Sequence, residues 1–221
     1  IEAQLRQGVM EEIQEEQPEE GTPQGSTVSP LLANIYLDPF DHSMEKKGYE
    51  MIRYADDAIV MCRSLKEAQN ALQEIQQWME SASLQLHGQK TRIVTVFKEG
   101  FDFLGYHFQG RKRWPRRKSL EKLQENLRQK TRRTNGQALA KIITNVNRTT
   151  RGWFEYFKHS HRHTFSILDG WIRMRLRSIL RKRDRRKGTG RGWDHRRWPN
   201  SFFAKQGLYS LLAAHTLVCQ S

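Results

Sequence analysis

Two adjacent acidic residues, Asp56 and Asp57, interrupt a run of apolar and β-favouring residues that extends from Ile52 to Cys62. This pattern predicts two short strands joined by a tight turn. Two carboxylates at one turn repel each other and resist burial between hydrophobic strands. A hard divalent cation such as Mg²⁺ would relieve that repulsion, because it takes carboxylate oxygens and keeps waters or phosphate oxygens as its other ligands. A solvated hairpin turn, in which Asp is a common residue, is the alternative.

Charge is distributed very unevenly along the 221 residues, whose formal net charge is +14. Residues 1–100 contain 9 Lys and Arg residues against 17 Asp and Glu residues, whereas residues 101–221 contain 29 against 7. A segment as basic as the second half repels itself unless a polyanion faces it, and nucleic acid is the usual candidate. We therefore expect an acidic half that carries the carboxylate turn and a basic half that binds nucleic acid.

The chain is long enough for one large domain or two small ones. No apolar run approaches the length of a membrane span, so we expect no membrane association. Cys62 and Cys219 are the only cysteines and have no metal-ligand spacing, which argues against a disulfide framework and fits a reducing compartment. Because the sequence begins with Ile1 instead of Met, we expect it to be a fragment.

The acidic half has the element pattern of an α+β fold, in which helices pack on an antiparallel sheet. Glycine and proline positions, capping residues and apolar periodicity define its predicted elements. In order, these are a Gly-rich loop at 21–26, a helix from Ser29-Pro30 to Gly48, the carboxylate hairpin, a helix that begins with a capping box of Ser64 and Glu67 and extends to Ala82, a strand at 93–97, and a hairpin at 101–108 bent at Gly105.

The basic half begins with a predicted linker at 111–118, which places domain boundaries at 1–110, 111–183 and 184–221. An apolar patch from Phe202 to Leu217 predicts a terminal helix that docks back on the domain. The other predicted helices span residues 119–133, 137–147, 150–159 and 166–183.

Several motifs now occur in a fixed order, and together they resemble the reverse transcriptase/maturase proteins encoded by group II introns. The resemblance covers residues 1–217 and implies a partial reverse-transcriptase palm over 1–110, a helical thumb/maturase domain over 111–183 and a basic C-terminal segment. It is carried by Gly21-Thr22-Pro23-Gln24-Gly25, Ser29-Pro30-Leu31-Leu32-Ala33-Asn34, Tyr54-Ala55-Asp56-Asp57, Phe103-Leu104-Gly105-Tyr106, Arg151-Gly152-Trp153-Phe154-Glu155-Tyr156-Phe157 and Arg196-Arg197-Trp198-Pro199-Asn200.

In such proteins the palm copies RNA into DNA by Mg²⁺-dependent nucleotidyl transfer, so the resemblance implies that Asp56 and Asp57 are catalytic metal ligands. It also places Lys90 near the incoming triphosphate as a proton donor, with a solvated turn lysine as the alternative. The residues that it implies as contacts to the nucleotide, template or primer are Gly21, Gln24, Gly25, Tyr54, Leu104 and Gly105.

The basic half is expected to bind intron RNA and assist splicing. Arginine side chains would contact phosphates, with a solvated charged face as the alternative. Some of its aromatic residues would stack on unpaired bases, although most are at helical spacing and are better explained as core. His159, His161 and His163 alternate like metal ligands, but no second cluster completes a site. The arginines expected to bind RNA are Arg151, Arg173, Arg175, Arg177 and Arg181.

One expected feature is missing from the sequence. The palm of this family has a further metal-binding Asp before the Gly-rich loop, and only twenty residues precede Gly21. We therefore expect the chain to be catalytically incomplete alone, and a non-catalytic RNA-binding splicing cofactor or a decayed polymerase is the alternative function. The expected partners are group II intron RNA, an RNA template, a DNA primer, and a second copy or a complementing N-terminal fragment. The expected location is the bacterial cytoplasm, or else an organelle.

Overall fold

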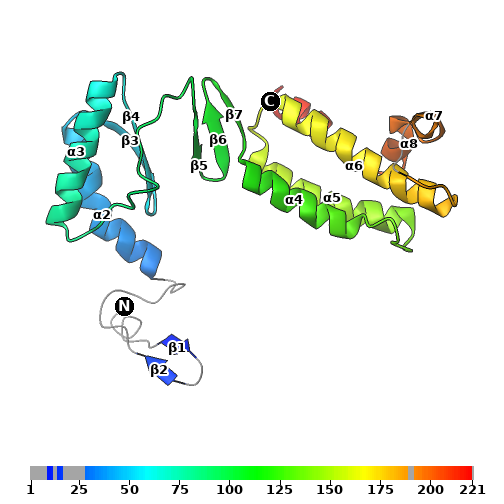
Figure 1. Ribbon diagram of the computed structural model, residues 1–221, viewed down its shortest axis with the longest axis horizontal. Helices are drawn as coiled ribbons and strands as arrows, with labels where there is room; N and C mark the ends of the chain where they lie inside the picture. The colour runs from blue at the N-terminus through cyan, green and yellow to red at the C-terminus, as the bar shows by residue number, and fades with distance from the viewer. Residues whose placement is uncertain (1–8, 12–13, 17–27, 189–191, 221) are drawn as a thin grey trace. The chain divides into compact units, whose positions relative to one another are not determined.

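The computed structural model describes residues 9–11, 14–16, 28–188 and 192–220 (Figure 1). It consists of two compact units, Ile1–Ile93 and Val94–Ser221. The helices and small antiparallel sheets make this an α+β protein, which confirms the predicted fold class.

Two helices and the carboxylate hairpin form the core of the first unit. Phe40 and Met44 on one helix and Ala71 on the other are buried, and the ring centroid of Phe40 lies 5.0 Å from that of Trp78. The strands of each hairpin pair antiparallel. The elements are β1 (Val9–Glu11), β2 (Gln14–Glu16), α2 (Ser29–Lys46), β3 (Glu50–Tyr54), β4 (Asp57–Met61) and α3 (Leu65–Ser81).

Local sequence signals determine where these helices begin. Pro30 occupies the first turn of α2, where its missing N–H costs no hydrogen bond. At α3, the Ser64 hydroxyl accepts a hydrogen bond of 3.1 Å from the Glu67 amide, and the Glu67 carboxylate accepts one of 2.7 Å from the Arg63 amide. The predicted cap is therefore confirmed, with the return bond one residue earlier than in the standard capping box.

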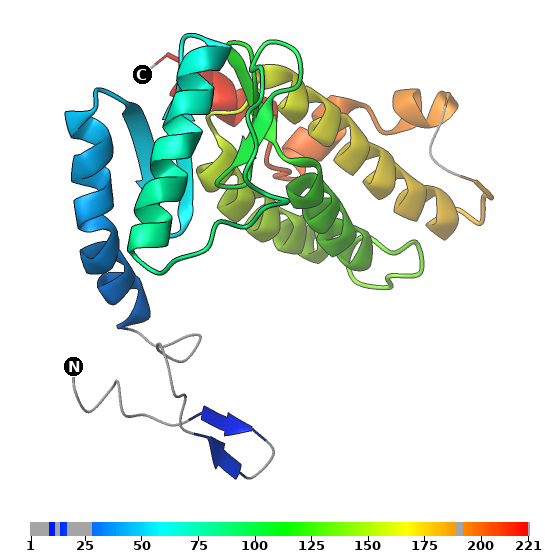
Figure 2. The same cartoon turned by 60° about the vertical axis from the view of Figure 1, so that its left-hand side comes forward.

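The second unit begins with a three-stranded antiparallel sheet in the order β5-β6-β7, which is followed only by helices. Figures 1 and 2 show its three long helices, α4, α5 and α6, lying side by side. The elements are β5 (Phe101–Phe103), β6 (Tyr106–Gln109), β7 (Lys112–Pro115), α4 (Arg117–Lys130), α5 (Leu139–Phe157), α6 (Arg162–Arg183), α7 (Trp193–Arg197), α8 (Asn200–Lys205) and α9 (Leu211–Val218).

The hydrophobic core of the second unit is built from apolar side chains of these helices. None of the described helices is long and apolar enough to cross a membrane. The buried members are Leu123, Leu127, Ile142, Ile143, Val146, Phe154, Phe165, Leu168, Ile172, Leu176, Ile179, Trp198, Phe203 and Leu211.

Five predicted elements differ from the structure. The strand expected at 93–97 is an irregular segment that leads into a turn, because no strand of the described residues pairs with it. The basic linker expected at 111–118 contributes β7, whose partner is β6. The helices expected at 137–147 and 150–159 are one helix, α5. The single terminal helix is two, α8 and α9, interrupted at Gly207, whose φ of +78° is outside the helical range.

The hairpin at 101–108 packs with the helices of the second compact unit. The Tyr106 hydroxyl donates to the Tyr156 carbonyl of α5 at 2.5 Å, and the Tyr156 hydroxyl donates to the Leu104 carbonyl at 2.7 Å. The Arg116 amide donates to the Gly105 carbonyl at 2.8 Å. These bonds attach the hairpin to the helices, so the compact unit begins at Val94.

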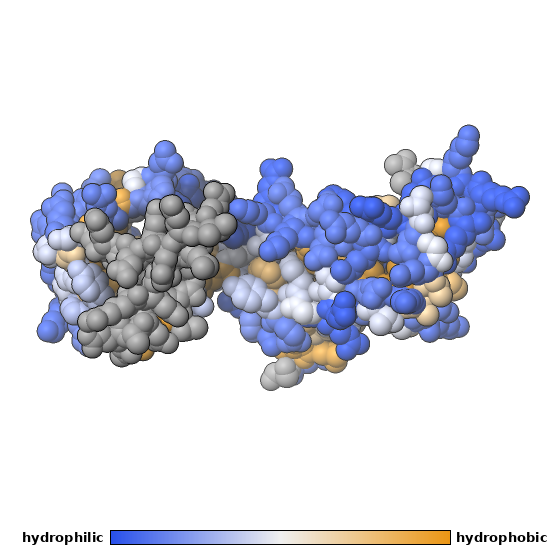
Figure 3. All heavy atoms as spheres, turned by 90° about the horizontal axis from the view of Figure 1, so that it is seen from below, coloured by the Kyte–Doolittle hydropathy of each residue, from blue (hydrophilic) through white to orange (hydrophobic). Residues whose placement is uncertain are grey.

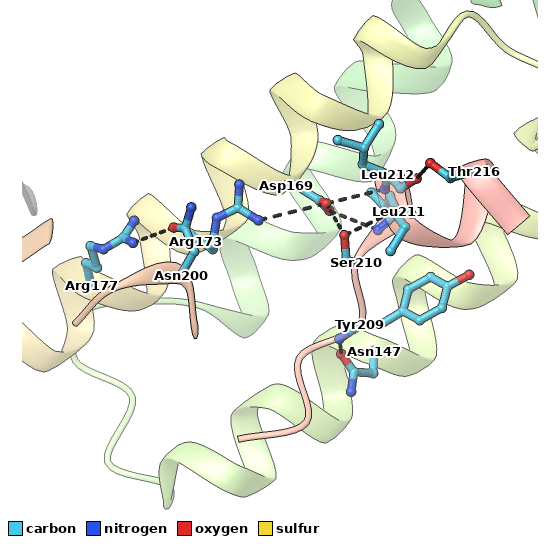
Figure 4. A network of polar contacts seen from close by, with 11 residues as sticks. Asn147, Asp169, Arg173, Arg177, Asn200, Tyr209, Ser210, Leu211, Leu212 and Thr216 are labelled. Carbon is cyan, nitrogen blue, oxygen red and sulfur yellow. Dashed lines mark hydrogen bonds and ion pairs between the residues drawn. The ribbon is translucent and has the colours of Figure 1, made fainter. Parts of the chain in front are cut away.

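Polar side chains of α5 and α6, which are buried or partly buried, hold the C-terminal segment in place (Figure 4). The carboxylate of Asp169, which is only 4% exposed, accepts hydrogen bonds from the Ser210 hydroxyl at 2.6 Å and from the amides of Leu211 at 3.0 Å and Leu212 at 3.3 Å. Asn147 accepts from the Tyr209 amide and donates to the Gly207 carbonyl. Asp169 therefore satisfies amides at the start of α9 that have no partner within that helix.

We expect replacement of Asp169 by Ala to destabilise the docking of α9 by about 2 kcal/mol, because two amides and a hydroxyl lose their acceptor. Hydrogen exchange measured on peptides that contain Leu211 and Leu212 should accelerate accordingly. Glu155→Ala, which removes an exposed ion pair with Lys158, is the control and should leave this exchange unchanged. Unaltered exchange in Asp169→Ala would show that apolar packing alone holds α9.

Candidate functional site

The carboxylate turn lies where the sequence predicts it, between β3 and β4. Tyr54 pairs with Asp57 at the end of the hairpin, and Ala55 adopts a left-handed φ of +54° that closes the turn. Asp56 and Asp57 are exposed, and Tyr54 is 65% exposed. Among the described residues, neither carboxylate forms a hydrogen bond or an ion pair. Both are therefore available to an external cation.

Arg53 stabilises this turn, and sequence reasoning missed it. Its guanidinium donates to the two carboxylate oxygens of Asp41 on α2 at 2.7 and 2.5 Å, and to the Ala55 carbonyl at 3.0 Å. The hydrogen bonds that Arg53 donates to the Asp41 carboxylate raise the pKa of Arg53 above its ordinary value. Because Asp41 neutralises Arg53, this neighbouring cation does not pair with Asp56 or Asp57. The signal in the sequence was a basic residue inside an otherwise apolar strand.

The donor set of the turn suits a hard cation only in part. Two carboxylates match the way Mg²⁺ is held by one or two protein acids together with substrate phosphates and waters. Within the described ranges, no group of three or more His, Cys, Asp or Glu residues could hold a metal ion alone. The alternation of His159, His161 and His163 is therefore no metal site within these ranges. Asp56 and Asp57 would need phosphate oxygens, waters or a further acid to complete a coordination shell.

Other residues predicted for the palm lie apart from the turn or outside the described residues. Lys90 is exposed in a turn in which its amide donates to the His87 carbonyl, and no hydrogen bond or ion pair joins its side chain to the carboxylates. Gly21, Gln24 and Gly25 are among the residues that the structure does not describe. The predicted grouping of these residues around one nucleotide therefore stays a prediction.

Leu104 and Gly105 form the turn between β5 and β6, with left-handed φ values of +46° and +78°. Hydrogen bonds within the second unit occupy both of their carbonyls: Leu104 accepts from Tyr156, and Gly105 accepts from the Arg116 amide and, at 3.3 Å, from the Ser119 hydroxyl. Burial raises the pKa of Tyr106, which donates to α5 beside this turn. The turn is held rigidly against α4 and α5, as a surface that positions a primer would require.

Most of the arginines predicted to bind RNA make internal contacts instead. Arg175 donates to the Thr131 hydroxyl at 2.6 Å and to the Thr131 carbonyl at 3.0 Å, where it caps the end of α4. Arg181 donates to the buried carboxylate of Asp194 at 2.6 Å, and Arg173 lies 3.8 Å from Asp169. Only Arg151 is fully at the surface, with its guanidinium 4.9 Å from the ring centroid of Tyr209.

Arg177 requires a correction, because it is only 2% exposed and cannot reach RNA in this fold. Its guanidinium donates to the Trp198 carbonyl at 2.9 Å and to the Asn200 side chain at 2.8 Å (Figure 4). It also lies 5.1 Å from the ring centroid of Phe203, and burial lowers its pKa. The sequence predicted an exposed arginine at this position, but the segment 198–203 covers this part of α6.

Among the aromatic residues considered for base stacking, Phe157 is buried and Trp114, Trp153 and Trp171 are partly buried. Trp171 already has the guanidinium of Arg175 at 5.5 Å from its ring centroid. Tyr156 is 55% exposed but uses its hydroxyl in the hairpin contact. The core interpretation is therefore the better one for most of this set. Figure 3 shows that hydrophilic residues dominate one face of the helical unit, while apolar side chains emerge only in small areas.

Comparison with known protein families agrees with this arrangement. Residues 3–108 match the family model of reverse transcriptases (RNA-dependent DNA polymerases), which defines the class of the first part. Residues 120–199 match the maturase-specific domain of group II introns. The two matches together cover most of the chain, and they identify it as a group II intron reverse transcriptase/maturase. A search of curated proteins found no match.

We expect Arg177→Ala to lower the free energy of unfolding of the helical unit by about 3 kcal/mol, because it removes two hydrogen bonds from a buried charged group. Arg151→Ala, which removes an exposed guanidinium, should change it by less than about 1 kcal/mol. Urea denaturation followed by far-ultraviolet circular dichroism measures both. Equal changes in the free energy of unfolding would mean that the hydrogen bonds of Arg177 contribute little to stability. The predicted contact of Arg177 with RNA would then have to be tested again.

We also expect Tyr156→Phe to loosen the turn at Leu104-Gly105, because the Leu104 carbonyl loses its only side-chain donor among the described residues. The lost bond corresponds to about 1 kcal/mol, or roughly fivefold faster amide exchange in the turn. Tyr36→Phe, which removes a comparable bond to the Ala82 carbonyl in the first unit, is the matched control. Exchange that stays slow only in Tyr36→Phe supports the contact; exchange unchanged in both variants contradicts it.

Proposed function

We propose that this chain takes part in Mg²⁺-dependent RNA-directed DNA synthesis through its first part and binds group II intron RNA through its second. The observation that carries this proposal is the exposed pair of carboxylates, which no described residue pairs with, on a turn that Arg53 supports, within a chain that matches a reverse transcriptase family and a maturase domain in that order. Proteins of this class generally use a divalent metal. The catalytic roles of individual residues belong to the proposal.

In this proposal, Asp56 and Asp57 hold the metal. Arg53 supports the turn through the Ala55 carbonyl and pairs with Asp41. When bound, Mg²⁺ supplies electrostatic stabilisation of the phosphoryl oxygens and activates the primer hydroxyl. Tyr54 lies next to the turn and contacts the nucleotide or primer. Gly21, Gln24 and Gly25 approach the newly formed base pair, and Lys90 donates a proton to the leaving pyrophosphate.

The turn at Leu104-Gly105 supports the primer. Its carbonyls are occupied by α4 and α5, so this function rests on the shape of the turn and on its backbone amides. The same contacts connect the turn directly to the maturase helices. Binding of a primer at this turn would therefore act on the helices of the RNA-binding part through hydrogen bonds of about 2.5–2.8 Å.

The RNA template, the DNA primer and a second protein chain are the further partners that we propose. Several large apolar side chains of the first unit are exposed, which supports a second copy or a complementing N-terminal fragment as a partner. These residues are Leu31, Ile35, Tyr36, Ile52, Tyr54 and Met61. The location in the bacterial cytoplasm or in an organelle remains a prediction from the sequence.

The decisive experiment is primer extension on an RNA template with and without Mg²⁺. We expect Asp56→Asn to lower the extension rate by about a hundredfold or more, because it removes a charged group that the reaction needs. Glu50→Gln is the matched control, since it neutralises an exposed acid at the other end of the same hairpin. Equal extension by the wild type and Asp56→Asn would refute the catalytic role of the turn.

A non-catalytic RNA-binding splicing cofactor is the second candidate function. It is favoured by the two-carboxylate donor set, to which the described residues add no third acid. Its signature would be no extension by the wild type, together with salt-sensitive binding of intron RNA that Asp56→Asn leaves unchanged. Extension that requires Asp56 would reject it.

A further inference from the structure

Trp193 is exposed to an unusual extent for a tryptophan. Its relative exposure is 75%, whereas the other five tryptophans of the chain are buried or partly buried. Exposing so large an apolar ring to water is unfavourable, and tryptophan is enriched where one face contacts a ligand. None of the internal contacts described for α5 and α6 involves Trp193.

The backbone around Trp193 is held firmly, so the ring cannot simply fold back into the core. The next residue, Asp194, is completely buried and its carboxylate accepts a hydrogen bond of 2.6 Å from Arg181. The Asp194 carbonyl accepts from the Trp198 amide at 2.9 Å, and Arg177 holds the Trp198 carbonyl. α7 is thereby attached to α6 at both of its ends, and Trp193 is presented outward at its first position.

A guanidinium accompanies the exposed ring. The Cζ atom of Arg196 lies 4.9 Å from the ring centroid of Trp193, within the range of a cation–π contact. The planar guanidinium can stack on a ring and still donate hydrogen bonds from its edge. Trp193 and Arg196 together therefore offer an aromatic face and hydrogen-bond donors at one place.

The surroundings are strongly basic. Residues 184–197 contain six Lys and Arg residues and two Asp residues. Asp184 pairs with Arg197 at 2.6 Å, and Asp194 is buried against Arg181, so both acids are already neutralised. The Arg181 side chain also donates to the Lys187 carbonyl at 2.7 Å, so the same arginine contacts both the basic segment 185–187 and Asp194 of α7. The exposed side chains of this loop include Arg185, Arg186 and Lys187.

We propose that Trp193 and Arg196 form a stacking site for one unpaired nucleobase of RNA, while Arg185, Arg186 and Lys187 contact the adjacent phosphates. Aromatic rings and arginine planes bind unpaired bases by stacking, whereas paired bases in a helix keep their faces covered by their neighbours. A protein partner is less favoured, because the adjacent exposed cations Arg185, Arg186 and Lys187 suit phosphates, whereas charged residues such as lysine are depleted at protein interfaces. The inference rests on the proposed binding of RNA and adds which part of the RNA this surface recognises.

The test uses the full chain and two RNAs with the same number of phosphates: a stem with an unpaired tail, and a fully paired duplex. We expect Trp193→Ala to weaken binding of the tailed RNA about tenfold and to leave the duplex unchanged. Trp193→Phe should restore most of the affinity, because it keeps an aromatic face. Phe97→Ala, which removes another ring that is 78% exposed, is the matched control and should have no effect.

The dependence of affinity on salt separates stacking from charge. Stacking releases no counterions, so Trp193→Ala should leave the slope of log K against log salt concentration unchanged. Arg186→Ala should weaken binding of both RNAs and reduce the magnitude of that slope by about one. Circular dichroism of each variant confirms that the fold is retained.

Three results would overturn the inference. Equal losses for both RNAs in Trp193→Ala, or no loss for either, would exclude recognition of an unpaired base. Unchanged RNA binding with altered sedimentation would show that Trp193 contacts protein. If the wild type binds neither RNA, the proposed RNA-binding function fails as well, whereas wild-type binding with a silent Trp193→Ala refutes only the stacking site.

Discussion

Hydrogen bonds from arginine side chains of α6 to backbone carbonyls hold the second unit together. Arg175 reaches the Thr131 carbonyl, Arg177 the Trp198 carbonyl and Arg181 the Lys187 carbonyl. Each of these carbonyls lies in or beside a loop or helix end, where a helix leaves acceptors unsatisfied. A guanidinium is suited to this role, because its donors are spread over a rigid plane and it stays charged. Burial lowers the pKa of Arg175 and Arg177, which reflects the desolvation cost that these bonds offset.

These contacts divide the positively charged residues of the basic half into two groups, those that bond within the fold and those that are exposed to solvent. Arg175, Arg177 and Arg181 of α6 are committed to the fold, and removal of Arg177 or Arg181 would loosen the C-terminal segment, because these two bond Trp198 and Asp194. The cations of the loop at 185–187 are exposed, and the nearby acids are occupied by other arginines. Net charge correctly indicated a polyanionic partner, but only the structure separates the charges that are available to it. The RNA-binding surface that we propose therefore lies beyond the C-terminal end of α6 and not along its middle.

The sequence predicted an element correctly where the residues that determine it lie close together in the chain. The Ser64 cap, the start of α2 and the carboxylate hairpin depend on residues a few positions apart, and all three are confirmed. Elements that depend on pairing with another strand were missed. The segment 93–97 has strand propensity, but no strand among the described residues pairs with it, whereas the charged β7 is a strand because the neighbouring β6 pairs with it. Periodicity likewise identified the polar face of α6 but could not reveal that the segment 198–203 covers Arg177.

The carboxylate turn differs from α6, because no described residue pairs with the carboxylates of Asp56 and Asp57. Arg53 is three residues from Asp56 and would ordinarily be its counterion. Asp41 accepts two hydrogen bonds from Arg53 instead, while the remaining nitrogen supports the Ala55 carbonyl at the turn. A purely structural turn would gain more from a direct pair between Arg53 and Asp56. Arg53 holds the turn backbone, and Asp41 neutralises its charge. Asp56 and Asp57 are therefore left without a protein partner among the described residues. Two such free carboxylates are what a divalent cation and its phosphate ligands require.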